Sequence, residues 1–307
     1  NVLMSFVLAL GIKAVGYEGM GFPGIAAGTV AAQYSGLLVA VLLAVFKYRR
    51  NTFSTLSFSD LKGVFKGSET RRFFVMNTDL FVRSLCFIAI YIGFTVISAR
   101  YGDLLLAVSS IMMKLLMIFS YFTDGFAYAG EAMTGKYIGA KDAVMLRQTV
   151  KWTFVWSMGI ALIFIGIYHF AGVPLLRMMT SDVTVVEASR EYLPWLLLMP
   201  VIGCAAFTWD GIYIGATASK AIRNSMLWAV VGFTAVWFIG IACLNWLSPG
   251  IGLDSAAAGS LPASGSDVSG ATGYGRIAMH ILMAAYFAHL LARTVYLSAK
   301  YRKVVHI

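Results

Sequence analysis

Long apolar runs alternate with short polar segments along this chain, and each run is about as long as a bilayer is thick. An apolar run of about 17–22 residues is the length of one helical membrane crossing. Strands of a membrane barrel would instead alternate apolar and polar residues over about ten positions. The pattern therefore predicts an all-α integral membrane protein. The expected spans are residues 25–46, 73–99, 104–138, 149–170, 192–216, 226–247 and 277–299.

The segments around these spans are predicted from their length and composition. Residues 2–12 form an apolar run too short to cross a bilayer alone, so we expect the second half of a span whose beginning is missing, followed by a turn at 16–24. Residues 60–67 are expected to form a short surface helix. Residues 248–275 are rich in Gly, Ser and Ala, which is typical of a flexible loop.

The composition supports membrane residence. Hydrophobic residues make up 59% of the chain, charged residues only 12%, and the mean hydropathy is +0.78. A soluble domain of this size needs a more charged surface. The net charge of +10 comes from Lys and Arg between spans rather than from a basic stripe with aromatics, so no nucleic acid partner is expected. The three cysteines lie inside apolar runs at spacings that predict neither a disulfide framework nor a metal site.

Basic residues alternate between successive connecting segments. Residues 47–72 carry seven Lys or Arg, whereas residues 248–275 carry none. Cytoplasmic loops hold the excess of Lys and Arg in membrane proteins. We therefore expect the segment 47–72 and the C-terminus to be cytoplasmic, in a bacterial inner membrane.

Several ionisable residues fall inside the spans, where they are costly and are functional candidates by default. Asp79 and Arg83 stand four residues apart and can pair on one helix face. The alternative is that Asp79 binds a cation whose affinity Arg83 tunes. Lys114 lies well inside its span, so we expect it to pair with a buried carboxylate.

A second group of candidates lies in the spans 104–138 and 192–216. Asp124, Tyr128 and Glu131 recur at spacings of four and three and so form one polar stripe. We interpret this stripe as functional; a polar contact between helices is the alternative. Asp210 is flanked by aromatic and small residues, which favours a lined cavity. In the last span, His289 is expected to be buried and hydrogen-bonded.

Motifs of enzymes and nucleotide-driven pumps are absent from the sequence. It contains no phosphate-binding G-x-x-x-x-G-K-[ST] loop, no nucleophile elbow and no metal-binding histidine pair. We therefore predict neither an enzyme nor a bound cofactor.

Two spans with similar sequences indicate an internal repeat. Residues 25–50 and 277–303 both open on Ile-Ala, contain a central Tyr and close on a Tyr followed by two basic residues. Repeats are common in transporters, although two apolar helices with basic ends also resemble one another by chance.

Three segments resemble the MATE family, the multidrug and toxic compound extrusion transporters, and in particular its DinF-like branch. They are NTDLFVRSL at 77–85, FTDGFAYAGEAMTGKYIGAKD at 122–142 and FTWDGIYIGATASKAIRNSM at 207–226. The resemblance covers nearly the whole chain. It implies a twelve-helix antiporter with two six-helix lobes around a central cavity.

On this resemblance the chain divides into three parts. Residues 1–50 would be the end of the N-terminal lobe, with part of helix 5 and all of helix 6. Residues 51–72 would be the cytoplasmic loop between the lobes. Residues 73–307 would be the complete C-terminal lobe, helices 7–12.

The resemblance also implies a function. Family members export organic cations or amphiphiles by alternating access, coupled to inward H+ or Na+, so a proton and Na+ are the two alternatives for the coupling ion. The partners would be the bilayer and a small-molecule substrate, and the full-length protein is expected to be monomeric. Lys114 departs from the uncharged polar residue expected there. The alternatives are a flippase for lipid-linked oligosaccharides and a non-transporting membrane subunit. The candidate residues of the coupling and substrate cavity are Asp79, Arg83, Lys114, Asp124, Tyr128, Glu131 and Asp210.

Overall fold

The computed structural model describes residues 2–12, 17–48, 68–247 and 265–304. The chain divides into two compact units, Asn1–Arg71 and Arg72–Ile307. Seven helices of the described residues are long and apolar enough to cross a membrane, as the hydropathy pattern predicts. The predicted surface helix at 60–67 lies outside the described residues.

The first unit is a helical hairpin. Helix α1 (Val2–Leu10) leads into the two-residue strand β1 (Gly11–Ile12), which pairs antiparallel with β2 (Tyr17–Glu18), and α2 (Phe22–Tyr48) follows. Glycines on α2 allow α1 to lie against it, because a Cβ atom added at Gly28 would come within 2.6 Å of the backbone of Ser5. Of the two helices, only α2 is a candidate span.

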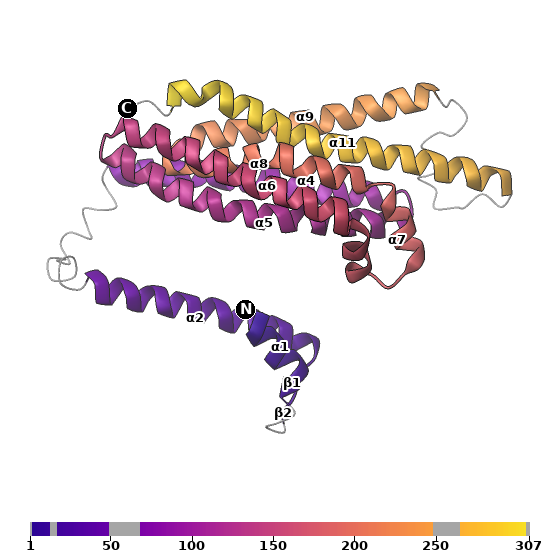
Figure 1. The fold of residues 1–307 in the computed structure, drawn as a ribbon, viewed down its shortest axis with the longest axis horizontal. Helices are drawn as coiled ribbons and strands as arrows, with labels where there is room; N and C mark the ends of the chain where they lie inside the picture. The colour runs from indigo at the N-terminus through magenta and orange to yellow at the C-terminus, as the bar shows by residue number, and fades with distance from the viewer. Residues whose placement is uncertain (1, 13–16, 49–67, 248–264, 305–307) are drawn as a thin grey trace. The chain divides into compact units, whose positions relative to one another are not determined.

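The second unit is a helical bundle (Figure 1). Its helices are α4 (Ser68–Ala99), α5 (Asp103–Gly139), α6 (Ala143–Met179), α7 (Val183–Arg190), α8 (Leu193–Gly215), α9 (Ser219–Leu247) and α11 (Gly265–Val304). The short helix α7 was not predicted. Helix α11 already begins at Gly265, so the prediction of a loop up to residue 275 is wrong for its last part. The apolar pattern could not show this, because the first turns of α11 contain few apolar residues.

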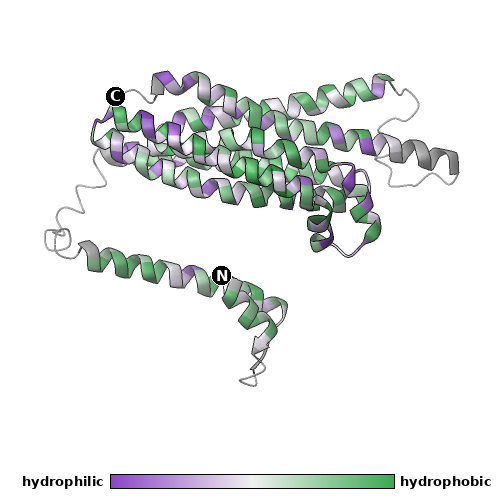
Figure 2. Ribbon diagram, viewed as in Figure 1, coloured by the Kyte–Doolittle hydropathy of each residue, from purple (hydrophilic) through white to green (hydrophobic). Residues whose placement is uncertain are grey.

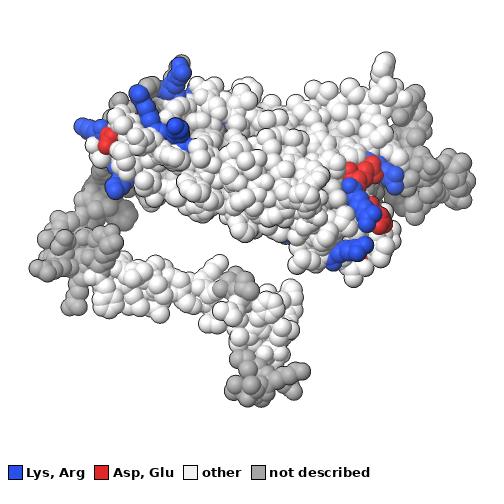
Figure 3. Space-filling view, in the orientation of Figure 1, with Lys and Arg blue, Asp and Glu red and all other residues white. Residues whose placement is uncertain are grey.

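Polar and charged residues gather at the two ends of the bundle. Figure 2 shows an apolar band along the helices between more polar ends, and Figure 3 shows the charged side chains confined to those ends on the visible face. One end, where α5 turns into α6, is mainly basic. The other, around α7, carries both signs. This distribution suits a bundle that crosses a membrane along its long axis.

Helix α8 lies at the centre of the bundle, and glycines set its contact with α5. A Cβ atom at Gly211 would collide with the carbonyl oxygen of Ala127, and one at Gly215 with the carbonyl oxygen of Glu131. Small residues are typical of helix contacts in membranes because they allow the backbones to approach. The two backbones therefore touch with no side chain of α8 between them at these two positions.

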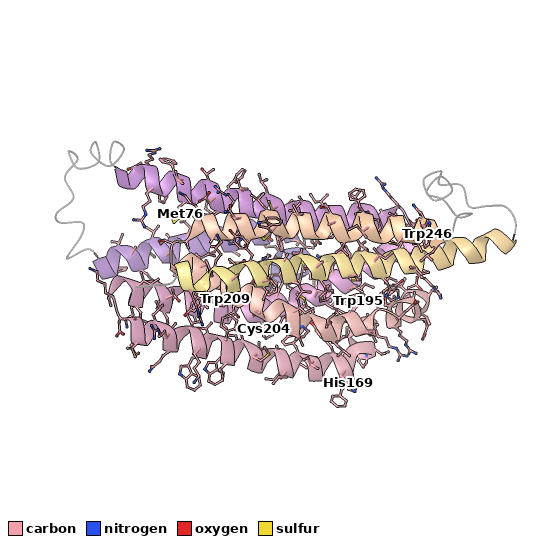
Figure 4. All side chains as sticks on the ribbon, turned by 90° about the horizontal axis from the view of Figure 1, so that it is seen from above. Met76, His169, Trp195, Cys204, Trp209 and Trp246 are labelled. Carbon is pink, nitrogen blue, oxygen red and sulfur yellow. The ribbon has the colours of Figure 1, made fainter. Side chains whose placement is uncertain are left out.

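Helix α11 runs beside α8 in the same direction (Figure 4). The indole Nε1 of Trp209 donates a hydrogen bond to Ser298 Oγ at 2.8 Å, and the Tyr213 hydroxyl donates to the Leu297 carbonyl at 2.6 Å. At the opposite end, Trp195 Nε1 donates to His280 Nδ1 at 3.0 Å. Hydrogen bonds at both ends therefore fix the register of the two helices.

Substitution of Gly211 by alanine tests the close contact of α5 and α8. The added methyl group would collide with a backbone carbonyl that cannot rotate away, so we expect Gly211→Ala to destabilise the protein by about 1–3 kcal/mol. Thermal denaturation in detergent measures this loss. The matched control is Gly159→Ala on α6, where a Cβ atom would meet nothing within 4 Å. Equal melting temperatures for the two variants would contradict the close contact.

Candidate functional site

A buried ion pair between α8 and α11 lies at the centre of the candidate site. The Asp210 side chain is only 10% exposed, and its Oδ2 accepts a hydrogen bond from Nη2 of Arg293, whose side chain is 2% exposed. The Arg293 guanidinium also lies over the Phe207 ring, 5.8 Å from its centroid. A second guanidinium approaches from α4, with Arg83 Nη2 at 3.9 Å from the same carboxylate oxygen. The charge of Asp210 is therefore balanced inside the protein.

Several buried polar atoms around this pair have no hydrogen-bond partner. They include the second carboxylate oxygen of Asp210, Nε of Arg293 and the hydroxyl of Thr294. His289, one turn before Arg293 on α11, is fully buried, as predicted, and its ring nitrogens have no side-chain hydrogen-bond partner among the described residues. Buried polar groups in proteins are nearly always paired, often through internal water. The cluster is therefore suited to hold water.

Asp124 lies on α5, three residues before Ala127, whose carbonyl oxygen meets Gly211 of α8. It is half-buried, and within the part of the chain that the structure describes no Lys, Arg or His lies within ion-pair distance of it. The charges of Asp210, Arg83 and Arg293 act on its carboxylate. Two carboxylates and two guanidinium groups thus share one region of the bundle, and only one of the carboxylates is paired.

Asp79 does not pair with Arg83, so that prediction is wrong. Its Oδ1 accepts from Nη1 of Arg223 at 2.6 Å, and its Oδ2 accepts from the Ser219 hydroxyl at 2.8 Å. Both partners come from α9, which α4 meets at Asp79, whereas Arg83 extends toward α8. Asp79 is only 2% exposed. It therefore fastens α4 to α9 and has both oxygens occupied.

The predicted stripe on α5 divides between two faces. Glu131 and Asp124 are half-buried, but Tyr128 is 68% exposed. Lys114 is also exposed and makes no ion pair with any described residue, so the prediction of a buried ion pair is wrong. Lys114, Tyr121 and Tyr128 follow one another at intervals of seven residues, which places them on one exposed face of α5.

Two arginines of this network were not predicted. Arg293 interrupts the apolar run of the last span, and the rule that selected Lys114 applies to it equally. Arg223 stands near the start of α9, where a basic residue is usually a sign of orientation. Its pairing with Asp79 joins residues 144 positions apart, and no local pattern indicates such a contact. Within the described residues, no group of three or more His, Cys, Asp or Glu is arranged to hold a metal ion.

Removal of Arg223 tests the structural role of Asp79. Arg223→Gln would leave a buried carboxylate without its cation, so we expect a loss of about 3–5 kcal/mol in stability. The control is Arg190→Gln, which removes an exposed pair with Glu187 and should cost about 0–1 kcal/mol. Unfolding by SDS in mixed micelles measures both variants. An Arg223 variant as stable as the Arg190 variant would refute the role.

Comparison with known proteins identifies the family. The family model MatE matches residues 80–241, more than half of the chain. DNA damage-inducible protein F of Escherichia coli is 32% identical over 249 residues, which are 80% of this chain and 51% of that protein. The probable multidrug resistance protein NorM of Photorhabdus laumondii is 25% identical over 269 residues, 82% of this chain and 54% of the relative.

A plant protein is also similar: DETOXIFICATION 42 of Arabidopsis thaliana is 25% identical over 156 residues, 50% of this chain and 28% of the relative. The chain spans about half the length of the two bacterial relatives. No solved structure matches it. The resemblance seen in the sequence is confirmed, and this membrane chain belongs to the MatE family.

Proposed function

We propose that the full-length protein is a cation-coupled efflux antiporter and that residues 73–307 form its C-terminal lobe. It exports organic cations or amphiphiles by alternating access, in exchange for H+ or Na+. The MatE match and the names of its relatives, a probable multidrug resistance protein among them, support this function. The observation that carries it is the unpaired carboxylate of Asp124 inside a bundle that spans a membrane.

Asp124 supplies the chemistry of exchange. A carboxylate away from bulk water is costly unless it binds a cation or a proton. No basic residue of the described chain lies within pairing distance of it, so that partner comes from outside. A proton or Na+ and an organic cation then compete for one negative charge, and each drives the other off.

The exposed face of α5 is proposed to line the central cavity. It carries Lys114, Tyr121 and Tyr128, which are all exposed. A lysine inside a span is costly against lipid, and such residues face a bundle interior or a water-filled space. In the full-length protein this face would therefore line a water-filled space and not lipid. Residues 1–50 would be the end of the N-terminal lobe. Residues 51–72 would connect the two lobes.

The basic end of the bundle indicates how the protein is oriented in the membrane. Lys and Arg are concentrated where α5 turns into α6 and where α11 ends (Figure 3). Under the positive-inside rule this end and the C-terminus are cytoplasmic, in a bacterial inner membrane. We propose that the protein acts as a monomer, with no cofactor other than a coupling ion.

Transport of lipid-linked oligosaccharides remains the second candidate. The exposed Lys114 and the partly exposed Arg83 favour it, because a phosphate-bearing substrate needs cationic groups in its cavity. Protection of the protein by pyrophosphate lipids, as opposed to efflux of cationic dyes, separates the two functions. A purely structural subunit is disfavoured by Asp124, which does not join helices by an ion pair as Asp79 and Asp210 do.

Replacement of Asp124 tests the proposed function. In proteoliposomes of the full-length protein, Asp124→Asn should lower the gradient-driven efflux of a cationic dye about tenfold or more, because the exchangeable charge is gone. Glu187→Gln on α7 removes an exposed acid outside the spans and should transport as the wild type does. Unchanged efflux by the Asp124 variant would reject the antiporter function as proposed.

A further inference from the structure

The two carboxylates beside the contact of α5 and α8 differ in what balances their charge. Asp210 is paired with Arg293 and has Arg83 at 3.9 Å. Asp124 has no ion-pair partner within the described chain. A guanidinium group keeps its charge under all physiological conditions and cannot be released as an ion can. Arg293 therefore occupies the position on Asp210 that a coupling cation would need.

The guanidinium group of Arg293 is fixed in position by its surroundings. Its side chain is 2% exposed and its guanidinium lies over the Phe207 ring. One turn further along α11, the Leu297 carbonyl accepts a hydrogen bond from the Tyr213 hydroxyl of α8. Withdrawal of the guanidinium would leave a buried carboxylate unpaired, which is costly. The pair is thus a fixed part of the fold.

Arg83 is held less firmly than Arg293. A third of its side chain is exposed, and it lies 3.9 Å from Asp210 without a hydrogen bond to it. Of the two arginines, it has the stronger electrostatic interaction with Asp124. A long side chain between two acids can change the carboxylate that it faces at little cost. Arg83 can therefore face Asp124 when that carboxylate is ionised and face Asp210 when Asp124 is protonated.

We propose that Arg293 is a tethered cation that closes Asp210 to Na+ and to organic cations, and that Asp124 is the proton-exchanging carboxylate of this unit, with Arg83 as its movable counter-ion. This inference rests on the proposed transport function and names the site of its coupling. When Asp124 is ionised, the two acids and two arginines sum to zero charge. When it takes up a proton, Arg83 turns fully to Asp210.

A proton suits this site better than Na+. A metal ion needs several oxygen ligands, whereas a proton needs one lone pair. The unpartnered side-chain atoms of Asp210 and Thr294 are groups to which internal water would hydrogen-bond. Water there would carry protons to and from the carboxylate of Asp124.

Chemical labelling of the wild-type full-length protein tests the assignment without a mutation. Dicyclohexylcarbodiimide adds to protonated carboxyl groups in apolar surroundings and leaves ionised ones unmodified. Mass spectrometry should find the label on Asp124, more at low pH than at high pH, and none on Asp210. A label on Asp210 with none on Asp124 would overturn the proposal.

A gain of Na+ binding gives a second test. Arg293→Gln would uncover the Asp210 carboxylate, so the melting temperature of this variant should rise when choline chloride is replaced by NaCl at constant ionic strength. The double variant Arg293→Gln/Asp210→Asn removes the uncovered charge and should lose that rise. Na+ stabilisation of the wild type that disappears in the double variant would identify Asp210 as a natural Na+ site and refute the proposal.

Neither test requires transport. If labelling and melting follow the expected pattern but the wild-type protein exports no dye, then the proposed function fails while the assignment of the charges stands. If dye is exported but the label is found on Asp210 alone, the coupling site has been placed wrongly.

Discussion

The interior of a bilayer gives a charged side chain no water, so each charge in these spans must find a partner within the protein or a place away from lipid. This constraint explains most of what distinguishes the bundle from a set of apolar helices. Asp79 obtains Arg223 and Ser219 from α9, and Asp210 obtains Arg293 from α11. The helices that supply these partners are thereby fixed against one another. Asp124 stands apart, because it is half-buried and has no ion-pair partner among the described residues.

The same constraint helps to explain where α8 lies in the bundle. Its position between α5, α6 and α11 depends on glycines on the side of α5 and on aromatic hydrogen bonds on the side of α11. Because Asp210 lies next to Gly211, the contact that brings α5 close also brings Asp124 toward the ion pair. Two neighbouring residues of α8 therefore have different roles: Gly211 allows the close contact with α5, and Asp210 forms the ion pair with α11.

The helices could be predicted from the sequence, whereas most partners of the charges could not. Span positions follow from hydropathy, which is a local property, and the predicted spans agree with the helices apart from their ends. The pairing of Asp79 with Arg223 depends on how α4 lies against α9, and residue spacing alone favoured its neighbour Arg83. Lys114 was expected to be buried because its depth along the span is visible in the sequence, while the direction of its side chain is not. Arg293 interrupts its apolar run as Lys114 does, so the sequence also carries the signal of this buried charge.

The contact between α5 and α8 has a mechanical consequence. Two helices that touch through their backbones have no intervening layer of side chains that could change rotamers and let them slide. We therefore expect them to move as one body. The relative motion would then fall to α4, which is joined to α9 through Asp79 and to α8 through Arg83. A helix that is joined to its neighbours at so few points can tilt about them.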